Sequence, residues 1–194
     1  MSGDYSRKRF NPEKHYQGVL RQQGRVDLDA DWNEYVDLQD RRWRAETIDV
    51  VGRSGVPDET PDGFKIAVSG GELTVGQGRM YVDGYVAENH GTAPAFEPTL
   101  EEGYGTAALP VKNQPYGGPV TVPAQVRSLV YLDVWRREVT HLQAPDLIEP
   151  AVNVDSTTRY QTAWQVRVLA NIPPDITCDT PLSDIPGWPT GNRS

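Results

Sequence analysis

The sequence predicts an α+β fold, in which an N-terminal arm and one long helix pack on a mainly antiparallel β domain with long Pro/Gly-rich loops. Apolar residues recur at three- and four-residue spacing over residues 27–51, which is the period of an amphipathic helix. Short alternating runs separated by glycine turns fill residues 64–88, and two longer runs lie at 128–140 and 161–169. We expect three regions: arm plus helix as the assembly region (1–51), β domain (52–170), and a proline-rich tail or linker (171–194).

Residues 1–26 alternate basic, aromatic and glycine residues without a helical or strand period. Asn11-Pro12 favours a turn, because proline keeps the preceding residue out of the helical region. The apolar residues available as anchors are Phe10, Tyr16, Val19 and Leu20. They are too few for independent folding, so we expect an extended arm with at most one short helix, lying on the domain or on a neighbouring subunit.

The helix is expected from Asp27 to about Val51, just before Gly52. Three aspartates crowd its first turn and three arginines lie toward its other end, which suits the helix dipole. Its apolar stripe consists of Leu28, Trp32, Tyr35 or Val36, Gln39 and Trp43. For the two tryptophans a core position is the favoured interpretation, and a partner-facing stripe is the alternative if helices assemble around an axis.

The β region is expected to begin as a compact antiparallel meander over residues 64–88, with Asp83-Gly84 as a tight hairpin turn. The run at 128–140 has apolar residues on both faces, which favours a central strand. The run at 161–169 alternates more cleanly, which favours one solvent-facing side. Residues 89–124 and 142–160 are proline-bearing loops, and the tail suggests a linker into a further C-terminal region.

The composition argues against several partners. A net charge of −8 without a basic stripe makes nucleic acid and anionic membrane surfaces poor ligands. No apolar stretch approaches the roughly 20 residues of a membrane span, and residues 1–10 lack the apolar run of a signal peptide. Because Cys178 is the only cysteine, no disulfide can form within the chain, as is usual in a reducing cytoplasm.

No catalytic, metal or cofactor site is predicted. The three histidines (His15, His90 and His141) lack metal-ligand spacing, and Cys178 has neither a helix N-terminus nor a basic neighbour. The aspartates of residues 27–31 resemble the opening of a calcium loop, but Trp32 stands where that loop needs glycine and Leu38 where it needs glutamate. Helix capping explains the same aspartates. Carboxylates are plentiful, but no acid–base pair can be singled out.

Two blocks of sequence are similar to a known family. The first reads Gly3-Asp4-Tyr5-Ser6-Arg7…Phe10-Asn11-Pro12…Lys14-His15-Tyr16…Gln22-Gln23-Gly24-Arg25-Val26…Leu28-Asp29-Ala30-Asp31-Trp32-Asn33-Glu34. It resembles the start of an uncharacterised domain family whose members lie in gene clusters for bacterial extracellular contractile injection systems. Tyr131-Leu132-Asp133-Val134-Trp135 and Trp164-Gln165-Val166 are similar to later blocks of that family, so the resemblance covers roughly residues 1–170. The segments 20–34 and 78–84 are more loosely similar to baseplate or fibre attachment proteins of tailed phages.

The resemblance implies a structural component of a phage-tail-like particle, near the baseplate or its fibre attachment, with no catalytic residues to carry over. Its partners would be baseplate, spike, tube or fibre subunits, and closed symmetry implies a homo-oligomer on a threefold or sixfold axis. The chain would be made in the cytoplasm and leave the cell within the particle. The expected assembly interface comprises Phe10, Tyr16, Leu20, Arg25, Leu28, Trp32, Tyr35 and Trp43.

Two other functions stay open. The first is a glycan- or cell-surface-binding module, which the aromatic residues of the loops and tail favour, namely Tyr104, Tyr116 and Trp188. The second is an injected effector enzyme, which only the abundance of carboxylates supports.

Overall fold

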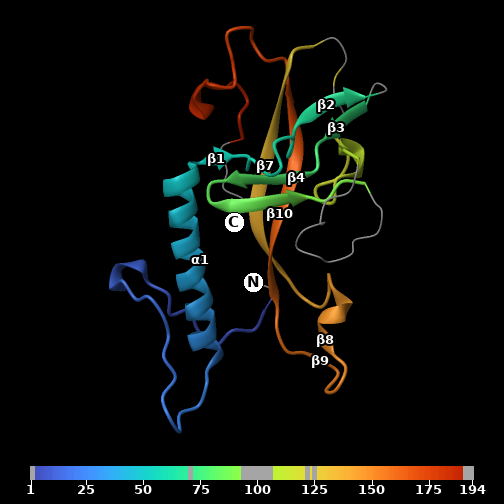
Figure 1. Ribbon diagram of the computed structural model, residues 1–194. Coiled ribbons are helices and arrows are strands. Elements are labelled where there is room, and N and C mark those ends of the chain that lie inside the picture. The colour runs from blue at the N-terminus through green and yellow to red at the C-terminus, as the bar shows by residue number, and fades with distance from the viewer. Residues whose placement is uncertain (1–2, 70–71, 93–106, 121–122, 124–125, 190–194) are drawn as a thin grey trace.

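The computed structural model describes residues 3–69, 72–92, 107–120, 123 and 126–189. One long helix stands beside a long two-stranded ribbon, and two small sheets pack across the ribbon near its middle (Figure 1). The tail lies near one end of the ribbon, and a short hairpin of β8 (Ile148–Glu149) and β9 (Val154–Asp155) lies at the other. The predicted α+β class is confirmed.

The ribbon consists of β7 (Ser128–Val139) and β10 (Arg159–Ala170), paired antiparallel from Ser128 opposite Ala170 to Val139 opposite Arg159. Within the described ranges the two strands pair only with each other, so the prediction of a central strand at 128–140 is wrong. Both faces of β7 carry apolar residues, and other side chains cover them in place of neighbouring strands. Leu132 packs on the main core, whereas Leu129 packs on the tail.

The prediction of a solvent-facing side for residues 161–169 is also wrong at the middle of β10. Four consecutive residues, Ala163 to Val166, are buried. The amide of Gln114 replaces a neighbouring strand there, because its Oε1 accepts from Val166 N at 2.8 Å. On the other face of β10, Gln165 Nε2 donates to the carbonyl of Gly117 at 2.9 Å. Loop residues therefore supply the partners that water was expected to supply.

The expected meander over residues 64–88 divides into two sheets. β3 (Glu72–Val75) lies between β2 (Ile66–Ser69) and β6 (Leu109–Pro110), whereas β4 (Gly78–Val82) lies between β1 (Ser54–Gly55) and β5 (Tyr85–Asn89). The β4–β5 turn has left-handed backbone at both central residues, with φ of 47° at Asp83 and 80° at Gly84. That geometry confirms the predicted Asp-Gly hairpin.

The main core lies between the ribbon and the two small sheets. Its centre is Trp164, which is 3% exposed, meets Phe64 edge-on at 5.0 Å and donates from Nε1 to the Glu88 carbonyl at 2.7 Å. Val75 and Val166 pack in the same cluster. One turn of 3₁₀ helix, η2 (Val111–Asn113), also contributes Val111. This cluster holds the two small sheets against the ribbon.

The tail carries a small core of its own. Ile172, Ile176 and Ile185 are buried together against Leu169 of the ribbon and Trp188. A 3₁₀ turn, η4 (Leu182–Asp184), precedes Ile185, and another, η3 (Pro145–Leu147), lies in the loop after β7. Of the two interpretations of residues 171–194, a tail or a linker, the packed isoleucines favour a tail for residues 172–188.

The predicted helix is confirmed as α1 (Asp29–Val51), two residues shorter at its start, with Gly52 after its end. Of its 23 residues only Ala30 and Leu38 are buried. Trp32 is 61% exposed and Trp43 is 66% exposed, so the core interpretation of both tryptophans is wrong. Of the helices in the described ranges, none is both long and apolar enough to cross a membrane.

Candidate interaction surface

Polar contacts hold α1 to the β sheets. Arg44 Nη2 lies 3.3 Å from Asp83 Oδ2 and 3.2 Å from the Asp83 carbonyl, and its guanidinium stacks on Tyr85 at 4.1 Å. Arg136 of the ribbon lies 2.8 Å from Asp40. The side of the helix that meets the sheets therefore carries charges. The apolar stripe lies to one side of these contacts, where Tyr35 and Trp43 border a groove between α1 and the ribbon.

The first-turn aspartates bind the arm. Ser6 donates to Asp29 from its backbone N at 2.8 Å and from its hydroxyl at 2.6 Å, and these bonds hold the pKa of Asp29 below its usual value. Arg9 forms an ion pair with Asp31. The N-cap residue is Leu28, which makes no side-chain cap bond, so capping is only a partial explanation of the aspartates. The described residues contain no group of three or more His, Cys, Asp or Glu side chains that could hold a metal ion.

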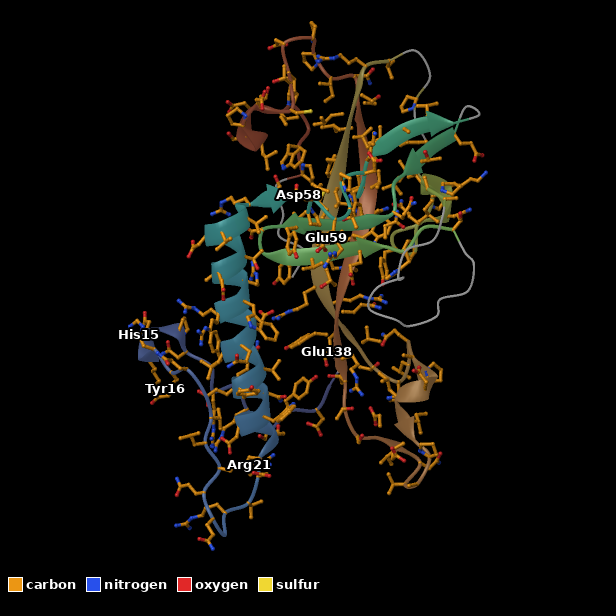
Figure 2. All side chains as sticks on the ribbon, viewed as in Figure 1. His15, Tyr16, Arg21, Asp58, Glu59 and Glu138 are labelled. Carbon is orange, nitrogen blue, oxygen red and sulfur yellow. The ribbon has the colours of Figure 1, made fainter. Side chains whose placement is uncertain are left out.

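The start of the arm also reaches the ribbon. The hydroxyl of Tyr5 lies 2.5 Å from Thr158 Oγ1 and donates to Glu138 at the end of β7. Partial burial, followed by the neighbouring carboxylate, raises the pKa of Tyr5. Figure 2 shows Glu138 on the ribbon, on the side that faces α1. The segment from Tyr5 to Arg9 therefore ties the helix N-terminus to the ribbon through polar contacts.

The rest of the arm lies along the outer side of the helix. It contains the single short helix that was expected, η1 (Pro12–Lys14), and His15 and Tyr16 lie there on the side away from the sheets (Figure 2). Phe10 is half-buried in a groove against α1, but Tyr16 is 56% and Leu20 is 91% exposed. Within the single chain, hydrogen bonds and ion pairs hold the arm instead of Tyr16 and Leu20. Whether these two side chains anchor it on a neighbouring subunit stays a prediction.

Four exposed apolar residues of α1 share one face of the helix with Leu28, the N-cap residue, whereas the exposed Val51 lies off this face. We call this face the α1 stripe, and it comprises Leu28, Trp32, Tyr35, Trp43 and Val50, each 40% or more exposed. The sequence predicted the first four as interface residues. It missed Val50, although Val50 follows Trp43 by seven residues, which is two helical turns. Beside the N-terminal end of the stripe lies a groove of about 690 Å³, which Leu20, Arg25 and Val26 also line.

A second groove, of about 360 Å³, separates α1 from the ribbon and β5. Aromatic side chains line it from both sides, Tyr35 and Trp43 on the helix and Tyr85 and Tyr160 opposite. Arg136 stacks on the Tyr160 ring at 4.2 Å. The pKa of Tyr160 is raised, first by burial and then by nearby carboxylates such as Asp37. The groove thus offers aromatic faces beside a guanidinium–carboxylate pair.

The histidine and cysteine side chains considered for metal binding or catalysis do not lie together. His141 Nδ1 lies 2.7 Å from Asp155 in an exposed pair, and Cys178 is an exposed free thiol in the tail. Two of the aromatic residues proposed for glycan binding are engaged within the protein. Tyr116 packs edge-on to Trp135 at 6.4 Å, and Trp188 meets Tyr131 at 4.6 Å. Tyr104 lies outside the described residues.

A family model described as a family of unknown function (DUF6519) matches residues 1–183, which include the arm, the helix, the ribbon and most of the tail. Neither a curated protein nor a solved structure matches the chain.

Proposed function

We propose that this chain, which belongs to the DUF6519 family, is a structural component of a phage-tail-like contractile injection particle, at the baseplate or fibre attachment. It acts there by protein–protein assembly. One observation carries the assembly role: the α1 stripe places five large apolar side chains in water along one helix face. Exposed apolar groups on one contiguous face mark interaction sites more often than scattered ones do.

The balance between core and surface supports the same conclusion. The described residues hold 13 buried apolar residues, whereas 19 large apolar residues are exposed. The helix contributes only Ala30 and Leu38 to the buried set, and polar contacts hold the arm. A neighbouring subunit that covers the arm and stripe would supply the apolar burial that α1 lacks as a single chain. The particle itself rests on the sequence resemblance of residues 1–170.

The test uses particles purified from the native producer. We expect the chain to co-sediment with sheath and tube proteins, and cryo-electron microscopy to show its density repeated around the baseplate axis. The Trp32 and Trp43 side chains should be covered by a neighbour in that density. Intact particles that lack the chain by mass spectrometry would refute the proposed location, and particles that contain it with both tryptophans in solvent would refute the interface.

Glycan or cell-surface binding remains a second candidate, and the aromatic groove between α1 and the ribbon favours it. Its volume of about 360 Å³ falls in the range of small-ligand sites, roughly 300–1,000 Å³. A glycan array probed with the purified protein tests this candidate. Binding that disappears in Tyr160→Ala would support it, and a blank array would remove it. An injected effector enzyme gains no supporting arrangement among the described residues.

A further inference from the structure

The charge pattern of α1 differs sharply between its two halves. Residues 27–40 contain six carboxylates and no lysine or arginine, whereas residues 41–51 contain three arginines and two carboxylates, Glu46 and Asp49. Arg41 and Arg42 are exposed, and only Arg44 of the three is paired with Asp83 on the β4–β5 hairpin. The apolar stripe runs through both halves, from Leu28 to Val50, with Gln39 at its midpoint.

We infer that the α1 stripe packs against the α1 stripe of a second copy of this chain, antiparallel, on a two-fold axis near Gln39. This inference rests on the proposed assembly function and names the partner at that surface. In an antiparallel pair the acidic half of each helix lies beside the arginine-bearing half of the other, and the two helix dipoles oppose each other. A parallel pair would place the two acidic halves side by side, where Arg21, Ser6, Arg9 and Arg136 bind four of the six carboxylates of each chain and leave Glu34 and Asp37 to repel their copies.

The available area agrees with a pair of this kind. A fully buried aromatic side chain covers about 200 Å², so the exposed fractions of Trp32, Tyr35 and Trp43 leave about 330 Å² of aromatic surface on each chain. Leu28, Val50 and the exposed Val26 enlarge this patch. A standard interface covers about 800 Å² per partner, of which somewhat more than half is apolar. The stripe and its margins are therefore of the right size for one helix–helix contact.

Symmetry explains the polar residue at the middle of the stripe. An interface on a two-fold axis brings the residue on the axis against its own copy. Within its own chain Gln39 Nε2 donates to the Gln17 carbonyl at 3.5 Å. The second amide hydrogen and the amide oxygen are enough for two Gln39 side chains to hydrogen-bond to each other reciprocally. A two-fold pair differs from the threefold or sixfold homo-oligomer expected from the sequence, although three such pairs could still occupy a sixfold particle.

Sedimentation equilibrium of the purified full chain tests the pair. We expect a mass that rises with concentration to twice the 21.6 kDa of one chain and no further. Trp43→Glu should weaken the dimer by about 30-fold or more, as for a central interface residue. The matched control is Leu142→Glu, which introduces the same charge at a residue that is 79% exposed outside the stripe and should leave the dimer unchanged. Both variants should keep the wild-type circular dichroism, because neither side chain is buried.

Cysteine cross-linking in a Cys178→Ser background tests the orientation. Gln39→Cys should form a disulfide dimer, whereas Val50→Cys should not, because with a rise of 1.5 Å per residue its two copies lie about 33 Å apart along antiparallel helices. Leu28→Cys combined with Val50→Cys should cross-link between chains. A disulfide dimer of Val50→Cys alone would overturn the antiparallel arrangement.

The two proposals fail separately. A chain that stays monomeric at the highest soluble concentration, yet co-sediments with native particles, would overturn the pair and leave the assembly role in place. A dimer weakened equally by Trp43→Glu and Leu142→Glu would also overturn the pair at this stripe. A stripe-dependent dimer that is absent from particles would keep the pair and overturn the proposed function.

Discussion

Replacing Trp164 and Trp43 by alanine, one at a time, should separate the folded core from the exposed stripe of the same chain. Trp164 is 3% exposed, so nearly all of its roughly 200 Å² of side-chain surface is covered, which corresponds to about 5 kcal/mol at 25 cal/mol per Å². The indole bond to the Glu88 carbonyl adds about 1 kcal/mol. After partial relaxation around the smaller side chain, we expect Trp164→Ala to lower the free energy of unfolding by about 3–5 kcal/mol.

Trp43→Ala should cost much less. Only about a third of the Trp43 surface is covered, roughly 70 Å² or at most about 1.7 kcal/mol, and alanine returns about 0.5 kcal/mol through its higher helix propensity. The expected loss is about 1 kcal/mol. Urea unfolding followed by far-ultraviolet circular dichroism, at concentrations where the chain is monomeric, measures both values. Equal losses for the two variants would show that α1 packs through its stripe in the single chain, and would refute the exposed-surface interpretation.

Two further perturbations probe how α1 is held. Gly84→Ala should destabilise the fold by about 1–3 kcal/mol, because a Cβ there would lie 2.9 Å from the Arg44 carbonyl as well as on left-handed backbone. Gly118→Ala, with similar backbone and open space around it, should cost only the backbone strain, and equal losses in urea unfolding would contradict a close hairpin–helix contact. Ser6→Ala removes the hydroxyl bond and keeps the backbone one, so it should raise the pKa of Asp29 part of the way toward its ordinary 3.8, as measured by carboxyl NMR titration. An unchanged pKa would mean that the Ser6 hydroxyl does not bind Asp29. Because the folded pKa is depressed, the stabilisation from this contact is present above about pH 3.8 and is lost as the pH falls through the folded pKa, so hydrogen exchange of the arm should increase there.

Local patterns in the sequence predicted the elements well. The three- and four-residue spacing from Leu28 to Trp43 identified the helix, because side chains at that spacing share one helical face. Asp83-Gly84 identified the β4–β5 turn, because few other residue pairs adopt left-handed backbone at both positions without strain. The alternating runs located β7 and β10 to within a few residues.

The sequence could not predict which groups cover which faces. Gln114 occupies the edge of β10, and the tail isoleucines cover one end of the ribbon, through contacts between residues far apart in the chain. No local period encodes such contacts, so the sequence pattern predicts a central strand at β7 and does not predict that the tail packs on the domain. The same limit applies to β3 and β4, which are consecutive in sequence but belong to different sheets.

The sequence by itself determined the α+β class, the helix and the hairpin, because each depends on residues close together in the chain. Only the tertiary structure decided that the apolar stripe of α1 faces water. Arg44 forms an ion pair with Asp83, and Asp40 forms one with Arg136. These ion pairs orient the helix so that Trp32 and Trp43 stay outside the core. A pattern of apolar residues shows that a helix has a face to bury, and the position of the other elements decides whether its own chain or a partner buries it.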